Sequence, residues 1–289
     1  MRDVFFRGAC TALVTPFLDG KVNYPMLELL LKRQMDAGIR TIVISGTTGE
    51  APTLSDGEKI ELFTRAKEFV KDQCLIIAGT GSNSTEHTVD LSIAAEQAGA
   101  DGLLVVSPYY NKGTYNGLYD HFRSVAESVH IPVILYNVPS RTGQDMPVSL
   151  YRQLSFIPNI KGVKEASTDI VKVARIRTYC PEDFTVWSGN DDQAVAAIAL
   201  GAEGVISVLS NVAPEETQAM AQAALAGDLD TASDLEVQLL PLMELLFCEV
   251  NPVPVKAAMK CIGYDCGDCR LPLGRMSPEN YEKLETYFS

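Results

Sequence analysis

Short apolar segments recur along the chain, and each is too short to form a helix. They are rich in Val and Ile, and each is followed by Gly, Pro, Ser or Asn and then by an amphipathic stretch. This alternation is typical of βα units whose parallel strands are buried on both faces. The segments are 9–14, 41–45, 75–78, 102–106, 132–136, 160–163, 184–187 and 204–208. Eight such units predict an α/β protein with a (β/α)8 TIM-barrel fold.

Capping residues mark the ends of several helices between these strands. Ser55 and Glu58 have the spacing of a capping box, which predicts a helix that starts after Ser55 and runs to Val70. Other helices are predicted at 24–37, 84–98 and 191–200, each followed by a glycine that can end it. An open doubly wound sheet is the alternative fold, but Gly79-Thr80-Gly81 is only a fragment of a dinucleotide-binding fingerprint.

The last quarter of the chain predicts further helices, at 228–247 and 252–261, without strands between them. A barrel of eight units does not need these residues, so we expect a C-terminal helical appendage. The sequence therefore predicts two regions, a catalytic (β/α)8 barrel over 1–224 and a C-terminal helical region over 225–289.

Composition narrows the classes of protein to which the chain belongs. Its 289 residues are 46% hydrophobic, which supports a large core. The net charge of -13 argues against a partner with a phosphate backbone, so no nucleic acid is expected. Apolar runs are too short to span a bilayer, and the N-terminus lacks the apolar core of a signal peptide. These features predict a cytoplasmic protein with no membrane partner.

The sequence contains no complete set of metal ligands in a recognisable spacing. Cys261, Cys266 and Cys269 form a cluster, but three cysteines without a close fourth ligand make an incomplete site, and a loop after a helix is the alternative. The pair Asp191-Asp192 could bind Mg²⁺, although acids are also favoured at a helix N-terminus. Neither a metal nor a cofactor is expected.

The sequence also argues against histidine-based catalysis, since it contains three histidines, His87, His121 and His130. His121 lies within an amphipathic stretch, and His130 lies in the link that follows it. Neither occupies the end of a predicted strand, which argues against a histidine triad or a multi-histidine metal site.

Reactive side chains collect instead at the predicted C-terminal ends of the strands, where barrels of this kind carry their chemistry. Lys164 comes near the end of a buried strand, where a neutral amine can attack a carbonyl to form a Schiff base. Tyr136 can donate and accept a proton, Thr47 and Thr48 supply hydroxyl groups, and Arg141 offers a planar fork for a carboxylate. Taken singly, each residue also fits a surface or turn position; their convergence on one face favours a site.

Five motifs carry a resemblance that runs nearly from end to end of the chain. The chain resembles the dihydrodipicolinate synthases, also called 4-hydroxy-tetrahydrodipicolinate synthases, which belong to the N-acetylneuraminate lyase superfamily of pyruvate-dependent aldolases. The segment 138–143, which contains Arg141, favours this family over the sialic acid lyases and the 2-keto-3-deoxy-sugar-acid aldolases. The motifs are 46–50, 108–112, 136–143, 164–167 and 204–207, and 251–256 and 270–273 extend the match.

The resemblance implies a reaction and a set of catalytic residues. Lys164 would form an imine with pyruvate, whose enamine attacks L-aspartate 4-semialdehyde before the adduct cyclises by transimination. Tyr136, Thr47 and Tyr110 match the family's proton-relay residues, and Tyr110 would reach into the site of a neighbouring subunit. The implied assembly is a homotetramer, a dimer of dimers. Another pyruvate-dependent aldolase, or a non-catalytic keto-acid sensor, are the alternatives.

Substrate-binding residues follow from the same resemblance. Thr48 matches the residue that holds the pyruvate carboxylate, and Arg141 matches the one that meets the semialdehyde carboxylate. Gly189 and Ile206 match backbone contacts around the substrate.

The regulatory cleft of the lysine-inhibited members is only partly retained. Asn83 and Tyr109 are kept, but Ala51, Lys59 and His87 stand where inhibited enzymes tend to carry a serine, a histidine and an acid. A lysine ligand would meet added positive charge and lose a carboxylate partner for its amine. We therefore expect lysine not to inhibit this protein.

Overall fold

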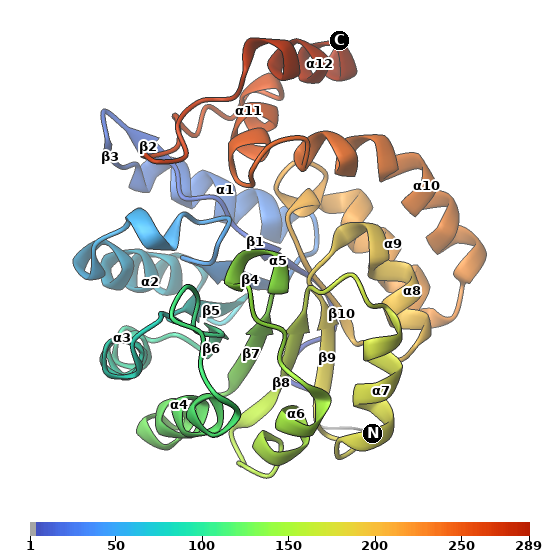
Figure 1. Ribbon diagram of the computed structural model, residues 1–289. Coiled ribbons are helices and arrows are strands. Elements are labelled where there is room, and N and C mark those ends of the chain that lie inside the picture. The colour runs from blue at the N-terminus through green and yellow to red at the C-terminus, as the bar shows by residue number, and fades with distance from the viewer. Residues whose placement is uncertain (1–3) are drawn as a thin grey trace.

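The computed structural model describes residues 4–289. Eight parallel strands close into a barrel in the order β1-β10-β9-β8-β7-β6-β5-β4, and helices surround it (Figure 1). The barrel closes where Thr11 of β1 pairs with Ile42 of β4. The predicted (β/α)8 fold is therefore confirmed.

The structure places every barrel strand within two residues of a predicted segment. The barrel strands are β1 (Gly8–Ala12), β4 (Thr41–Ile44), β5 (Leu75–Gly79), β6 (Gly102–Val106), β7 (Val133–Asn137), β8 (Ile160–Glu165), β9 (Thr185–Ser188) and β10 (Gly204–Ser207). A short antiparallel hairpin, which the sequence pattern did not predict, consists of β2 (Phe17–Leu18) and β3 (Lys21–Val22).

Helices and 3-10 turns connect the strands and extend beyond them. The helices are α1 (Tyr24–Asp36), α2 (Asp56–Val70), α3 (Thr85–Gln97), α4 (Tyr115–Ser128), α5 (Pro139–Thr142), α6 (Val148–Leu154), α7 (Val171–Tyr179), α8 (Ala194–Ala199), α9 (Pro214–Ala226), α10 (Leu229–Leu246), α11 (Val253–Cys261) and α12 (Pro278–Phe288). The 3-10 turns are η1 (Ala51–Thr53), η2 (Asp191–Gln193) and η3 (Leu209–Asn211). The helix predicted at 191–200 is thus divided into η2 and α8.

Side chains alternate along each strand between the barrel interior and the surrounding helices. On β6, Leu104 belongs to the inner cluster, whereas Leu103 and Val105 pack outward in the larger helix-facing cluster. On β7, Ile134 and Tyr136 point inward in the same way. Because successive strand residues face opposite sides, continuous apolar runs are needed to fill both layers. Tyr136 therefore brings a phenol hydroxyl into the mostly apolar set of side chains that face the barrel interior.

The predicted capping box begins α2. Ser55 donates its backbone N–H to the Glu58 carboxylate at 2.9 Å, and the Glu58 backbone N–H donates to the Ser55 hydroxyl at 3.3 Å. These bonds satisfy backbone donors that a helix start would leave free. They also fix the entry of α2 beside the loop that follows β4.

The C-terminal region packs along one side of the barrel and then returns to its mouth. Helix α10 lies against α8 and α9 (Figure 1). The Lys256 ammonium lies 2.6 Å from the fully buried Glu50 carboxylate, which also accepts the Arg270 backbone N–H at 2.8 Å. The predicted boundary at 224/225 falls in the last turn of α9, just before Gly227 with its φ of 82°, and the division into two regions stays a prediction. No helix within residues 4–289 is long and apolar enough to cross a membrane.

Candidate active site

Lys164 stands at the centre of the candidate site. It is the penultimate residue of β8 and is only 5% exposed. Its strand neighbours are Tyr136 on β7 and Trp187 on β9, and its Nζ lies 4.5 Å from the centroid of the Tyr136 ring. Within residues 4–289 it forms no salt bridge. Since no carboxylate holds the amine, it is free to approach an electrophilic carbonyl carbon.

A cavity of about 510 Å³ surrounds this amine at the C-terminal end of the barrel. Its walls bring together most of the predicted site residues, although they come from the ends of different strands. They are Thr47, Thr48, Tyr136, Arg141, Lys164 and Gly189. A volume of this size suits a small ligand, and its position is the usual one for a TIM-barrel active site.

Two predicted residues do not line this cavity. Ile206 is fully buried in the barrel interior, and Val208, two residues later, reaches the cavity wall instead. Tyr110 is 91% exposed, with a backbone φ of 69°, and does not line the Lys164 cavity. Both functional roles stay predictions, and for Tyr110 a role within its own chain's cavity is not supported.

Arg141 lies at the rim of the cavity, on the short helix α5 that follows β7 directly. Its guanidinium is exposed and donates from Nη2 to the Asn251 backbone oxygen at 3.2 Å. Gly143, with a φ of 69°, ends α5 in the left-handed conformation that glycine adopts readily. One contact thus steadies the arginine while most of its donors stay available for an anion.

Thr48 is buried, and its hydroxyl oxygen accepts a hydrogen bond from the Asn251 side-chain amide at 3.1 Å. Asn251 itself is 4% exposed and lines the same cavity. The sequence marked Asn251 only as part of a matching motif. Its contact with Thr48 spans 203 positions along the chain, and no local pattern predicts such a pairing.

Comparison with known proteins decides the family. The model of the dihydrodipicolinate synthetase family matches residues 5–289. The chain belongs to this family. A relative from Acetivibrio thermocellus, named 4-hydroxy-tetrahydrodipicolinate synthase, is 47% identical over 285 residues, which cover 99% of this chain and 97% of that protein.

Solved structures of dihydrodipicolinate synthases superpose closely on the chain. The enzyme from Aquifex aeolicus has a TM-score of 0.96 at 42% identity and covers 98% of this chain and 97% of its own. A monomeric dihydrodipicolinate synthase variant has a TM-score of 0.95 at 40% identity, covering 97% of this chain and 95% of its own. The resemblance found in the sequence motifs is therefore confirmed at the level of the family.

Asp191 is a buried carboxylate of this synthase-family site, and the sequence suggested for it either a helix start or a Mg²⁺ pair with Asp192. Its Oδ2 accepts the backbone N–H groups of Val208 and Leu209, both at 2.9 Å, and it lines the Lys164 cavity. Burial raises the pKa of the Asp191 carboxyl, although these bonds and the charge of Lys164 oppose the rise. Asp191 therefore fixes the segment after β10, and it also lies at the start of η2, as the sequence predicted.

A second buried network supports the strand end that carries Lys164. The adjacent Glu165 accepts from the Asn137 amide at 2.8 Å and from the Tyr151 hydroxyl at 3.1 Å, and the Lys172 ammonium lies 3.5 Å away. Burial, with the adjacent Glu165 charge, raises the pKa of Tyr151 well above its ordinary value, so the phenol keeps its proton. The end of β8 is consequently fixed from the side opposite to the cavity.

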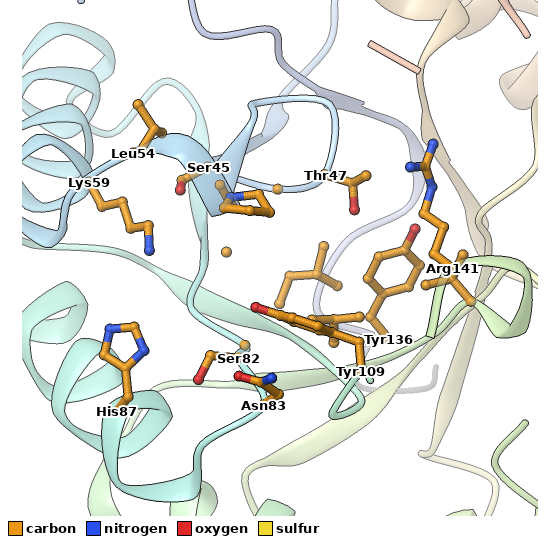
Figure 2. Close-up of a pocket in the computed structure, with 18 of the residues that line it drawn as sticks. Ser45, Thr47, Leu54, Lys59, Ser82, Asn83, His87, Tyr109, Tyr136 and Arg141 are labelled. Atoms are coloured by element: carbon orange, nitrogen blue, oxygen red, sulfur yellow. The ribbon is translucent and has the colours of Figure 1, made fainter. Parts of the chain in front are cut away.

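A second cavity of about 570 Å³ adjoins the first and shares Thr47, Tyr136 and Arg141 with it (Figure 2). The residues of the predicted regulatory cleft all line it. They are Ala51, Lys59, Asn83, His87 and Tyr109. Figure 2 shows the Lys59 and His87 side chains on the side of this cavity away from Arg141.

Asp56 is the acid of this second cavity, and the sequence analysis missed it. Its carboxylate lies 2.9 Å from His87 Nε2 and 3.4 Å from Lys59 Nζ. Partial burial favours a higher pKa for Asp56, but hydrogen bonding from His87 and the charge of Lys59 outweigh it and lower the pKa. Its position as the first residue of α2, directly after the N-cap Ser55, was the only signal in the sequence.

No group of residues within 4–289 has the arrangement of a metal site. Of the cysteine cluster, Cys266 and Cys269 are buried and Cys261 is partly exposed. Burial raises the pKa of both Cys266 and Cys269 to about 12, so their thiols stay protonated near neutral pH.

Proposed function

We propose that the protein condenses pyruvate with L-aspartate 4-semialdehyde to give 4-hydroxy-tetrahydrodipicolinate, a step of lysine and diaminopimelate biosynthesis. The observation that carries this proposal is the buried Lys164 amine, which forms no salt bridge within residues 4–289, in a cavity that also holds Thr48 and Arg141. Those two residues offer separate sites for the carboxylates of the two substrates. The name of the Acetivibrio thermocellus relative supports the same activity.

Lys164 acts as the nucleophile in the proposed reaction. Its Nζ forms a bond to the C2 carbonyl carbon of pyruvate, and loss of water gives the protonated imine. Removal of a C3 proton converts the imine into an enamine, whose C3 attacks the aldehyde carbon of the semialdehyde. The amine of the semialdehyde then attacks C2 and displaces Lys164, which closes the ring and regenerates the free amine. The net change is the release of one water molecule.

Tyr136 and Thr47 serve the proton transfers of these steps. Tyr136 lies beside Lys164 across the β7–β8 pair, with its ring centroid 4.5 Å from Nζ, and its phenol exchanges protons with the adduct as water leaves. Thr47 lines both cavities together with Tyr136. Gly189 and the backbone near Ile206 provide the remaining contacts around the bound pyruvate.

A neighbouring subunit supplies Tyr110 in this proposal. The side chain is 91% exposed and lies outside its own chain's Lys164 cavity, so it is available to enter the site of another copy. A dimer is the smallest assembly that completes the relay, and we infer a homotetramer built from two such dimers. Because one of the matched structures is a monomeric variant, the oligomeric state of this protein should be measured first.

Borohydride reduction in the presence of pyruvate tests the nucleophile. A reduced pyruvyl group is expected on Lys164, and peptide mass mapping locates it. Lys161 and Lys112 are internal controls, because label on either residue would show that the site is wrongly assigned. Absence of any label would support the keto-acid sensor, and faster turnover of N-acetylmannosamine than of the semialdehyde would support a sialic acid lyase.

A further inference from the structure

Asn251 joins the two predicted carboxylate sites of the cavity. Its side-chain amide donates to the Thr48 hydroxyl at 3.1 Å, and its backbone oxygen accepts from Arg141 at 3.2 Å. It is 4% exposed and lines the Lys164 cavity. A residue from the segment between α10 and α11 therefore contacts both binding residues, and no role in the reaction has yet been given to it.

The bond to Thr48 determines what the threonine hydroxyl can do. A hydroxyl has one proton to donate and two lone pairs that accept. Because the Asn251 amide occupies one lone pair, the Thr48 proton remains available for another partner. No acceptor for that proton is found among residues 4–289. The hydroxyl is thereby kept as a donor toward the cavity, which is what a carboxylate requires.

The segment that carries Asn251 is held against the Thr48 loop. Its Oδ1 is buried without a hydrogen-bond partner in the described chain, so the side chain is not satisfied by the protein alone. Five residues later, the Lys256 ammonium pairs at 2.6 Å with Glu50, which lies two residues after Thr48. This ion pair fixes the Asn251 segment against the Thr48 loop, so the amide and the hydroxyl meet in one geometry.

We propose that Asn251 is a positioning residue that directs the Thr48 hydroxyl toward the carboxylate of the keto acid bound to Lys164. The inference rests on the proposed function, since it requires pyruvate to bind with its carboxylate at Thr48. Asn251 acts through Thr48 and takes no part in bond making. Its backbone contact with Arg141 is independent of its side chain, which gives the test an internal reference.

Asn251→Ala removes the amide and leaves the backbone oxygen that Arg141 contacts. The pyruvate concentration for half-maximal borohydride trapping should rise about tenfold, because a hydrogen bond to a carboxylate loses its alignment. The KM for the semialdehyde should change less than that, since the Arg141 contact persists. A purely structural role would instead lower Tm and affect both substrates alike.

Asn251→Asp gives the same test with a side chain of equal size. Its carboxylate can only accept from Thr48 near neutral pH, so it turns the hydroxyl proton away from the substrate. A rise in the half-maximal pyruvate concentration larger than that of Asn251→Ala is expected. Asn116→Asp is the matched control, because Asn116 is exposed on α4 and the variant carries the same change of charge.

A double-mutant cycle with Thr48→Val separates positioning from direct charge effects. If Asn251 acts through Thr48, Asn251→Ala should add almost nothing to the pyruvate defect of Thr48→Val. Additive effects of the two substitutions, or an unchanged trapping curve in Asn251→Ala, would overturn the inference. Failure of the proposed function is distinct, because the unmodified protein would then fail to trap pyruvate or fail to consume the semialdehyde.

Discussion

Gly189 packs so closely against Lys164 that a Cβ atom at position 189 would crowd the lysine side chain. A Cβ atom at Gly189 would lie 3.0 Å from Cε of Lys164 and 2.6 Å from Cβ of Ala166. Gly189 follows β9 directly, and its backbone N–H donates to the Glu165 oxygen at 2.7 Å. The glycine therefore allows the end of β9 to close against the lysine stem while the amine reaches the cavity.

Gly189→Ala should lower the rate of imine formation by up to about a hundredfold, since misplacing a reacting group by about 1 Å has an effect of that size. Overpacking should also reduce the free energy of unfolding by about 1–3 kcal/mol. The time course of borohydride trapping with pyruvate measures the first effect, and thermal unfolding measures the second. Gly57→Ala is the control, because nothing lies within 4 Å of its added methyl group on α2. Equal activity of both variants would contradict the packing argument.

Arg141→Ala should reduce kcat/KM for L-aspartate 4-semialdehyde while pyruvate trapping on Lys164 stays nearly unchanged. Loss of a charge-assisted pair costs about 1.5–3 kcal/mol, or about ten- to a hundredfold in kcat/KM. The exposed position of Arg141 favours the lower part of that range. Arg141→Lys keeps the charge but not the planar fork and should recover only part of the loss. An equal defect in pyruvate trapping would show that Arg141 contacts pyruvate, which contradicts the prediction.

Subunit mixing tests whether Tyr110 acts in a neighbouring site. Tyr110→Phe removes the phenol hydroxyl and should lower kcat at least about tenfold by interrupting proton transfer. Lys164→Ala should be inactive. If Tyr110 acts across the interface, hybrids of these two variants contain one intact site per mixed pair and regain activity. Hybrids without recovered activity, in an assembly shown by light scattering to exchange subunits, would place the tyrosine within its own chain.

Periodicity predicted the barrel because each strand must fill two apolar layers, and that requirement is written locally in the sequence. Capping residues such as Ser55 predicted helix starts for the same reason, since their bonds span only a few positions. The β2–β3 hairpin was missed because each of its strands has two residues, too few to show alternation.

Local sequence patterns could not predict the polar contacts between residues far apart in the chain. The Asn251 amide and the Thr48 hydroxyl meet only after the whole barrel has closed, and the same is true of Lys256 and Glu50. Strand ends identified Lys164, Tyr136 and Thr48 because parallel strands share one edge. The partners that orient such residues depend on how the C-terminal region returns to that edge, which residue types alone do not specify.

Arg270 and Glu58 should make stability depend on pH in the acid range. Hydrogen bonding from the Arg270 guanidinium, at 2.6 Å, lowers the pKa of Glu58 to about 2. A depressed carboxyl pKa contributes stability above the pKa of the unfolded chain, and this contribution is lost as pH falls toward about 2. Arg270→Ala should therefore lower the free energy of unfolding at pH 7 by about 1–2 kcal/mol.

The difference between Arg270→Ala and the unmodified protein should shrink as pH falls from about 4.5 toward 2. Denaturant unfolding at a series of pH values measures it. Arg275→Ala is a matched control, because Arg275 pairs with Asp268 while its side chain is 81% exposed, and such a surface pair contributes little. A difference that stayed constant with pH would show that Arg270 acts through its bonds to the Thr53 and Gly20 backbone oxygens or its packing on Phe17 instead.

Lysine should not inhibit this protein at millimolar concentration. The second cavity already contains the Lys59 ammonium, and Asp56, the acid among its described lining residues, is engaged by both His87 and Lys59. A lysine ligand would bring a further cation to this group without an unoccupied carboxylate to receive it. Loss of one charge-assisted bond weakens binding about ten- to a hundredfold, and like-charge proximity weakens it further.

Exchange of the cleft residues tests this reasoning in both directions. Initial rates of the unmodified protein should be unchanged by about 1 mM lysine, whereas the combined variant Ala51→Ser, Lys59→His and His87→Glu should become sensitive, because it supplies an acid and removes the competing ammonium. Glu86 is exposed on α3 and does not line the cavity, so it does not replace that acid. Half-inhibition of the unmodified protein well below about 1 mM lysine would contradict this prediction. It would mean that Asp56 pairs with the bound lysine more strongly than with Lys59 and His87.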